Sequence, residues 1–299
     1  MFGAYVQELF ADDSNIKVEV HDRKWIEQKK MGAFLSVAAG SHEEPKFIEI
    51  TYKNADDASK PFVFVGKGVT FDTGGISLKP SKGMPTMRAD MGGAACIIGA
   101  MHAVSKMALQ INMKCLIPCT DNMPSSKATR PGDVVTAMNG KTIAVDNTDA
   151  EGRLILADAL CYSGCFNPKF VIDMATLTGA IGVALGKGAV GVYSNTHALY
   201  DILQEAGART GDRVWRMPLW KLYTKLMTDC TAYDLQNVAE VGGGSCTAAG
   251  FLREFAPKDV DWMHIDIAGV MDGAQPMKYV KGMSGRPTRT IIEFIVMNQ

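Results

Sequence analysis

A single stretch of eight residues, 146–153, gathers side chains that are suited to metal chemistry. It contains three acids, an amide and an arginine, and it directly precedes an apolar, helix-like segment. If its backbone is extended, Asp149 and Glu151 point to the same side, and carboxylate oxygens grouped in this way suit a divalent cation. Arg153 adds a planar cation that can hold an anion with two hydrogen bonds. The alternative is a capped helix start, where acids are favoured near the positive end of the helix.

A second group of polar residues follows the apolar residues 61–65. Lys67 lies between two glycines, Asp72 follows, and Lys79 and Asp90 come next along the chain. Glycines at such positions let the backbone approach another group closely. The residue order of a phosphate-binding loop, GxxxxGK[ST], is absent, so this interpretation is rejected.

Strands and helices that alternate along the chain must position these groups. Strands are expected at residues 61–65, 111–119, 142–145, 170–174, 190–193 and 262–267, and helices at 94–109, 151–165, 196–208, 245–255 and 289–297. This order predicts an α/β fold, a three-layer domain with a mainly parallel central sheet covered by helices on both faces. Ligands bind such sheets beyond the carboxyl ends of the strands, which is where Lys67, Asp72, Thr176 and Asp266 fall.

The first 60 residues carry no recognisable chemistry. Residues 5–10 and 25–37 have helix-like spacing, and residues 47–52 alternate like a strand. We therefore predict a connecting segment over residues 1–60 and a catalytic domain over residues 61–299.

The composition indicates a soluble cytoplasmic protein. The chain has 299 residues, of which 47% are hydrophobic and 21% charged, with a formal net charge of -1. This charge predicts no binding to nucleic acid or to a membrane, and no apolar run is long enough to span a bilayer. The first residues lack the basic region of a secretory signal. Seven cysteines without a CxxC pair indicate reduced thiols.

Four carboxylates are expected to converge at one crevice, namely those of Asp72, Asp90, Asp149 and Glu151. They would repel one another strongly unless a cation lay among them. A single structural Ca²⁺ is one answer, but calcium loops usually take their ligands from one short segment. Here the candidates are spread from Lys67 to Glu151, which favours a two-metal centre that activates water for hydrolysis.

At this point the sequence resembles the leucyl (cytosol) aminopeptidase family. Residues 147–154, NTDAEGRL, match the signature octapeptide of that family. Further matching blocks, in the same order, are residues 66–68, 72–75, 87–91, 175–179, 212–218 and 285–290. The resemblance covers the chain from about Trp25 to its end.

The resemblance implies two divalent metal ions. The tighter site would use Lys67, Asp72, Asp90 and Glu151, and the more exchangeable site would use Asp72, Asp149 and Glu151. Zn²⁺ is the expected ion, with Mn²⁺ or Mg²⁺ as alternatives at the exchangeable site. As a ligand Lys67 must be neutral, and partial burial together with an adjacent cation would lower its pKa. The residues alone would make Lys67 a charge partner of the acids.

The resemblance also implies a mechanism and a substrate class. A water activated by the two metal ions attacks the peptide carbonyl, Lys79 polarises that carbonyl, and Arg153 holds a bicarbonate ion that acts as general base. The free amine of a peptide substrate binds the tighter metal. The five histidines fall outside the matched ligand blocks and are expected on the surface or in the core.

A substrate pocket with a preference for leucine-like side chains is implied as well. Main-chain groups of Leu177 would position the substrate. The residues expected to line the pocket are Met87, Thr176, Gly179, Ala268 and Met271, and methionines there would give an adaptable wall. For Met87 and Met271 the alternative is a purely structural role in the core.

Family members usually carry a separate N-terminal domain, most of which is missing here. They form hexamers, so a homo-oligomer is expected, with a trimer as the alternative without that domain. The chain is then a fragment, a short form or an engineered piece, and an inactive truncated form is one alternative to an active enzyme. A non-catalytic structural or chaperone-like relative is the other, although such a relative would be expected to lose ligands. A phosphoesterase is disfavoured because the matched blocks contain no metal-binding histidine.

Overall fold

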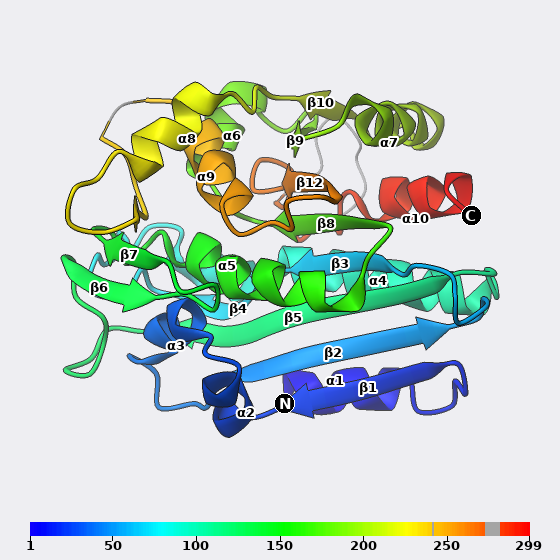
Figure 1. The fold of residues 1–299 in the computed structure, drawn as a ribbon, viewed down its shortest axis with the longest axis horizontal. Coiled ribbons are helices and arrows are strands. Elements are labelled where there is room, and N and C mark those ends of the chain that lie inside the picture. The colour runs from blue at the N-terminus through cyan, green and yellow to red at the C-terminus, as the bar shows by residue number, and fades with distance from the viewer. Residues whose placement is uncertain (241, 273–281) are drawn as a thin grey trace.

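The computed structural model describes residues 1–240, 242–272 and 282–299 (Figure 1). Its centre is a sheet of nine strands in the order β1-β2-β5-β3-β8-β12-β9-β10, with β4 paired to β5. The strands are β1 (Ile16–His21), β2 (Lys46–Lys53), β3 (Phe62–Gly66), β4 (Gly68–Asp72), β5 (Asn112–Asn122), β8 (Phe170–Ala175), β9 (Val190–Ser194), β10 (Val214–Arg216) and β12 (Asp261–Asp266).

The middle of this sheet is parallel, as predicted. Strands β5, β3, β8 and β12 pair in parallel, and every residue of β3 and β8 is buried. Continuous apolar runs of this kind are typical of strands covered on both faces. The antiparallel strands β1 and β2 extend the sheet at one side, and β9 pairs antiparallel with β12 at the other.

Helices cover both faces, which confirms the predicted three-layer α/β fold. Side chains of α1 (Phe2–Leu9), α4 (Gly92–Lys106), α7 (His197–Thr210) and α10 (Thr288–Met297) form one hydrophobic core with the sheet. A second core on the opposite face contains α2 (Arg23–Gln28), α3 (Gly32–Ala38), α5 (Glu151–Ser163), α8 (Lys221–Thr228) and α9 (Gly244–Arg253). Figure 1 shows α5 in front of the sheet and α4 behind it. No helix among the described residues is long and apolar enough to cross a membrane.

Some elements differ from the sequence-based expectation. The single helix expected over residues 25–37 is wrong, because Lys30 has a φ of 58° and this left-handed residue separates α2 from α3. The strand expected at residues 142–145 forms as β7 (Thr142–Val145), but in a small separate sheet with β6 (Asp133–Thr136) and β11 (Leu235–Gln236). Within residues 1–60, β2 pairs with β5 over eight residues of the main sheet.

Candidate metal centre

The five predicted metal ligands lie together where β3 and β4 end. Lys67 lies between these strands, Asp72 ends β4, and Asp90 follows the 3-10 helix η1 (Met84–Ala89). Asp149 lies in the loop before α5, and Glu151 is the first residue of α5. Residues from separate segments, namely 67–72, 90 and 149–151, therefore lie together at the carboxyl ends of the parallel strands.

Two lysines pair with these acids. The Nζ atom of Lys67 lies 2.6 Å from Asp90 Oδ2 and 2.8 Å from Glu151 Oε1. The Nζ atom of Lys79 lies 2.8 Å from Asp72 Oδ2 and also contacts Asp149 Oδ1. Four carboxylates and two ammonium groups, all ionised, sum to a net charge of −4 + 2 = −2. The cluster thus has an excess of negative charge.

Burial and mutual repulsion favour the neutral forms of these carboxylates. Burial raises the pKa of Glu151 to about 8, and the neighbouring Asp72 and Asp90 raise it while Lys67 lowers it. Burial also raises the pKa of Asp90 and of Asp149. For Lys67, burial lowers the pKa, but the surrounding carboxylates outweigh it and the net pKa is raised. Without a further cation, Lys67 is therefore the charge partner that its residue type alone indicates.

The arrangement fits a divalent cation. Asp72, Asp149 and Glu151 each offer one carboxylate oxygen, and these three oxygens lie within 4.8 Å of one another. Glu151 Oε2 is buried and has no hydrogen-bond partner among the described residues. A buried carboxylate oxygen without a partner is costly, and a hard cation would satisfy it.

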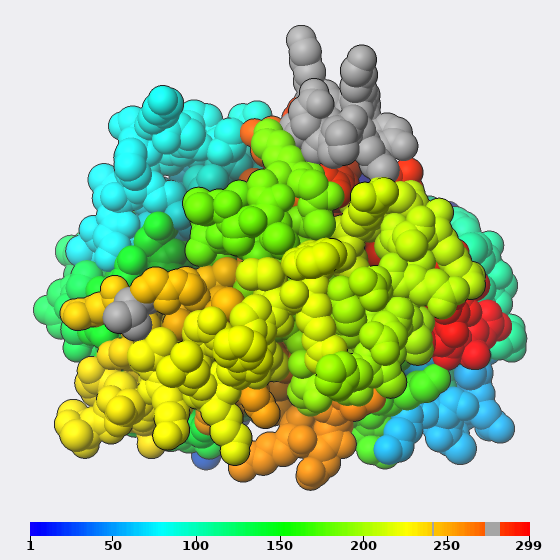
Figure 2. Space-filling model, turned by 90° about the horizontal axis from the view of Figure 1, so that it is seen from above, coloured from blue at the N-terminus to red at the C-terminus, as the bar shows by residue number. Residues whose placement is uncertain are grey.

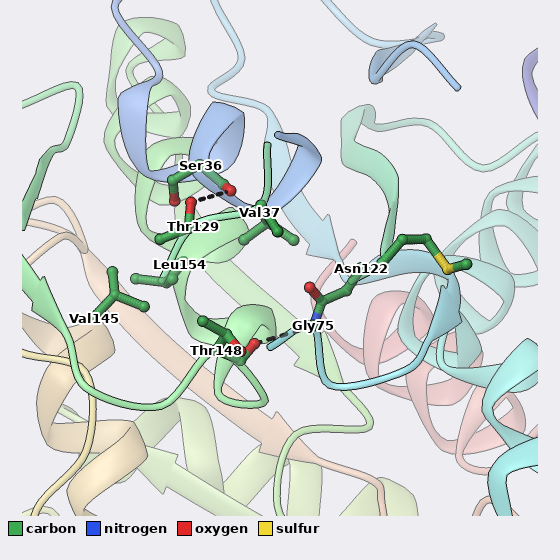
Figure 3. A pocket seen from close by; sticks show the side chains of 10 residues that line it. Ser36, Val37, Gly75, Asn122, Thr129, Val145, Thr148 and Leu154 are labelled. Carbon is green, nitrogen blue, oxygen red and sulfur yellow. Dashed lines mark hydrogen bonds between the residues drawn. The ribbon is translucent and has the colours of Figure 1, made fainter. Parts of the chain in front are cut away.

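Asn122 forms a hydrogen bond with one of the predicted metal ligands, a role that was not expected from the sequence. Its Nδ2 atom donates to Asp72 Oδ1 at 2.9 Å and to the carbonyl of Thr148 at 3.0 Å. Figure 3 shows Asn122 and Thr148 at a small cavity of about 10 Å³ next to this loop. Asn122 thereby links the end of β4 to the segment before α5. The only sequence signal was an asparagine shortly after a predicted strand.

Gly152 leaves room for Lys67. A Cβ atom at position 152 would lie 2.8 Å from Lys67 Nζ and 2.9 Å from Leu177 Cδ1. Any side chain there would push the amine away from Glu151. The glycine of the acidic stretch is therefore explained by this close approach.

A cavity of about 460 Å³ opens beside the carboxylates. All five predicted metal ligands and Lys79 line it. So do all six residues predicted to contact the substrate, which are Met87, Thr176, Leu177, Gly179, Ala268 and Met271. Figure 2 shows the segment of residues 76–90 (cyan) and the residues after β8 (green) side by side on this face. Sequence reasoning missed further lining residues, namely Pro80, Lys82, Gly83, Met84, Thr86 and Thr178.

Arg153 is not among the residues that line the cavity. It is buried on α5, and its Nη1 atom donates to the carbonyl of Asn237 at 2.6 Å. Its Nε atom has no hydrogen-bond partner among the described residues. Burial lowers the pKa of Arg153 to about 10, while Glu151 and Asp266 raise it. A buried guanidinium with an unused donor can hold an anion.

His264 is a core residue, as expected for the histidines. It is completely buried, and its Nδ1 atom lies 2.5 Å from Asp173 Oδ1. It does not belong to the cavity lining.

Comparison with known proteins shows the family to which the chain is similar. The model of the cytosol aminopeptidase family, catalytic domain, matches residues 1–292. The chain is 56% identical over 294 residues to a cytosol aminopeptidase of Xenopus tropicalis, with 97% of this chain and 56% of that protein covered. It is 55% identical over 295 residues to a cytosol aminopeptidase of Homo sapiens, with 97% and 56% covered. A probable cytosol aminopeptidase of Dechloromonas aromatica is 49% identical over 291 residues, with 97% and 57% covered. The chain thus spans little more than half the length of these relatives.

Proposed function

Because this chain belongs to the cytosol aminopeptidase family, we propose that it is a metal-dependent aminopeptidase that removes N-terminal residues from peptides. The observation that supports this most strongly is the single cavity that contains the carboxylate cluster, Lys79 and every residue predicted to contact the substrate. A leucine-like N-terminal residue is the preferred substrate, because methionines form part of the wall and adapt to such side chains.

Two metal ions would be held by five residues. Lys67, Asp72, Asp90 and Glu151 would hold the tighter ion, proposed to be Zn²⁺. Asp72, Asp149 and Glu151 would hold an exchangeable Zn²⁺, Mn²⁺ or Mg²⁺, so Asp72 and Glu151 would serve both. When bound, such ions lower the pKa of a water molecule enough for it to attack a peptide carbonyl near neutral pH.

Lys67 must change its protonation state in this proposal. Its amine is charged while its nearest neighbours are the carboxylates of Asp90 and Glu151. Two divalent ions would add four positive charges to a cluster whose net charge is −2 when all six of its groups are ionised. Lys67 would then release its proton, since complete burial and the added positive charge both disfavour its charged form.

Lys79 is proposed as the residue that stabilises the developing oxyanion. It lines the cavity and contacts Asp72 and Asp149. Metal ions on these carboxylates would compete with Lys79 for the same oxygens. The released ammonium would donate a hydrogen bond to the substrate carbonyl oxygen.

Arg153 is proposed to hold a bicarbonate ion, which would accept the proton of the attacking water. The unused Nε donor and the burial of the guanidinium support this role. General base catalysis of this kind contributes roughly 10²–10⁴-fold to the rate. No histidine among the described residues lines the cavity to take that part.

The substrate would be a peptide with a free amino terminus. Its neutral amine would bind the tighter metal ion, and main-chain groups of Leu177 would hold its backbone. Loaded with Zn²⁺ or Mn²⁺, the chain should release leucine from a leucyl peptide, as followed by mass spectrometry, and should leave the N-acetylated peptide intact. A folded, metal-loaded chain that cleaves neither peptide would favour the alternative, a non-catalytic relative or an inactive short form.

We further propose a cytoplasmic homo-oligomer, a hexamer as in the family. The proposed oligomer rests on the membership of the family. The chain covers 56% of the Xenopus relative, so its own assembly has to be measured. Sedimentation of the purified chain distinguishes a hexamer from a trimer or a monomer.

A further inference from the structure

Asp266 is a buried carboxylate that accepts four hydrogen bonds from two separate segments. It is the last residue of β12 and is 1% exposed. Its Oδ1 atom accepts from the backbone N–H groups of Leu177 at 3.2 Å, Thr178 at 3.4 Å and Ala268 at 3.2 Å. Its Oδ2 atom accepts from the hydroxyl of Thr178 at 2.6 Å.

The two segments joined by Asp266 follow adjacent strands, and both line the same cavity. Leu177 and Thr178 follow β8, whereas Ala268 follows β12, and all three line the cavity beside the carboxylate cluster. The ladder between the parallel strands β8 and β12 ends with the pair Asp266–Ala175, followed by one bond from Ile267 N to Ala175 O at 2.9 Å. Beyond that point Asp266 provides the connection between the two segments.

One peptide group links Asp266 to the candidate metal centre. The bond between Thr176 and Leu177 is trans, so its carbonyl and its N–H point in opposite directions. The carbonyl of Thr176 accepts a hydrogen bond from Lys67 Nζ at 3.0 Å, while the N–H of Leu177 donates to Asp266. The Thr176 hydroxyl donates to Asp90 Oδ1 at 2.6 Å. The orientation of this peptide therefore depends on Asp266 at one end and on two predicted metal ligands at the other.

We propose that Asp266 is a positioning residue for substrate binding. It holds the segments 175–179 and 267–271 at a fixed separation and fixes the Thr176–Leu177 peptide, without touching substrate or metal itself. The consequence for substrate binding rests on the aminopeptidase function proposed above. The connection of the two segments by Asp266 is independent of that function.

The test compares Asp266→Asn with Asp173→Asn. Asparagine keeps the shape but turns one acceptor oxygen into an N–H donor, so the side chain can no longer accept all four hydrogen bonds. Asp173 is a matched control, because it is buried on the adjacent strand β8 and bonds to Trp262 Nε1 at 2.8 Å and to His264, but not to the cavity segments.

Hydrogen–deuterium exchange of the metal-free proteins gives a readout that does not depend on activity. We expect the amides of Leu177, Thr178 and Ala268, which donate to Asp266, to exchange at least about tenfold faster in Asp266→Asn, because an acceptor is weakened or lost, and to change little in Asp173→Asn. Unchanged exchange in both segments, or the same increase in both variants, would overturn the proposal.

Steady-state kinetics on the metal-loaded proteins test the consequence. For a leucyl peptide, KM should rise on the order of tenfold in Asp266→Asn with a smaller change in kcat, as expected for lost substrate positioning. An unchanged KM in a folded Asp266→Asn protein would contradict the proposed role of Asp266 in substrate binding. If the unsubstituted chain shows no activity, the proposed function fails, while the exchange experiment still decides the role of Asp266.

Substitutions at Thr178 keep the test decisive if Asp266→Asn does not fold. Thr178→Val removes one of the four hydrogen bonds, together with the bond from Ile181 N to the Thr178 hydroxyl, and should give a smaller version of the exchange effect at Leu177 and Ala268 and of the rise in KM. Thr178→Ser keeps the hydroxyl and should restore values close to those of the unsubstituted chain. Identical exchange in these two variants would overturn the proposal.

Discussion

The amine of Lys67 lies 2.8 Å from the carboxylate of Glu151, and both side chains are buried at the carboxyl ends of the central parallel strands. Because Lys67 is also 2.6 Å from Asp90, its ammonium group offsets part of a dense negative charge. Metal binding at these acids must therefore compete with the proton on Lys67. Metal affinity should accordingly rise with pH.

Replacement of Glu151 tests the shared ligand. Glu151→Ala should lose both bound metal and peptide hydrolysis, because this carboxylate is assigned to both sites. Metal content by mass spectrometry and hydrolysis of a leucyl peptide are measured on the same sample. Glu205→Ala, at an exposed position of α7, serves as the control. A metal-replete and active Glu151→Ala protein would rule out the two-metal assignment.

Replacement of Lys79 separates catalysis from metal binding. Lys79→Ala should lower kcat by roughly 10²–10³-fold, the usual effect of removing one donor to an oxyanion, while bound metal stays near normal. Lys221→Ala, an exposed residue at the start of α8, should retain full activity. If Lys79→Ala loses its metal, the lysine has a structural role instead.

Asn122 should control metal affinity without being a ligand. Asn122→Ala removes the hydrogen bonds to Asp72 and to the Thr148 carbonyl, which orient the loops that carry Asp72 and Asp149. Loss of such a partner typically weakens metal binding 10–100-fold. Competition with a chelator of known affinity measures the change, with Asn139→Ala at an exposed turn as the control. Equal affinities in the two variants would show that Asn122 does not orient the ligands.

Arg153 should confer a response to bicarbonate. The unsubstituted enzyme should be stimulated by added bicarbonate, and Arg153→Ala should lose this stimulation together with roughly 10²-fold or more in kcat. The rates are compared in bicarbonate-free and bicarbonate-containing buffer at constant ionic strength. Stimulation that persists in Arg153→Ala would place the anion elsewhere.

The fold class could be predicted because apolar runs alternate with helical segments. Every residue of strands β3 and β8 is buried, as their continuous apolar sequences indicate. The break between α2 and α3 could not be predicted, because it depends on a left-handed backbone at Lys30, a residue type that gives no sign of it.

The predicted ligands could be named because the acidic stretch and the other family blocks are local in sequence. Asn122 and Asp266 could not be assigned roles in this way. Asn122 bonds to Thr148, 26 residues away, and Asp266 to Leu177, 89 residues away, and those contacts depend on the register of neighbouring strands. A single asparagine or aspartate at the end of a strand does not show which segment it will meet.

The buried pair of His264 and Asp173 should make stability depend on pH. Burial lowers the pKa of His264, but Asp173 and Asp266 outweigh it, so the net pKa is raised above the ordinary value. The folded state then binds this proton more tightly than the unfolded state does. The stabilisation is complete below about pH 6.5 and is lost as pH rises through the raised folded-state pKa.

Melting temperatures of the metal-free chain and of Asp173→Asn, compared across this pH range, measure that contribution. The difference between the two proteins should be largest at the acidic end and should shrink as pH rises, because the substitution removes the partner that holds the proton. Parallel curves would show that the pair does not titrate as described.

The most direct test of the account is the hydrolysis of leucine p-nitroanilide by the purified chain after chelation, followed by addition of Zn²⁺ or Mn²⁺. The N-acetylated anilide serves as the control substrate. We expect no hydrolysis after chelation, recovery on addition of either metal, and no release from the acetylated compound. Hydrolysis that survives complete metal removal, or equal cleavage of the acetylated compound, would contradict a metal-dependent aminopeptidase.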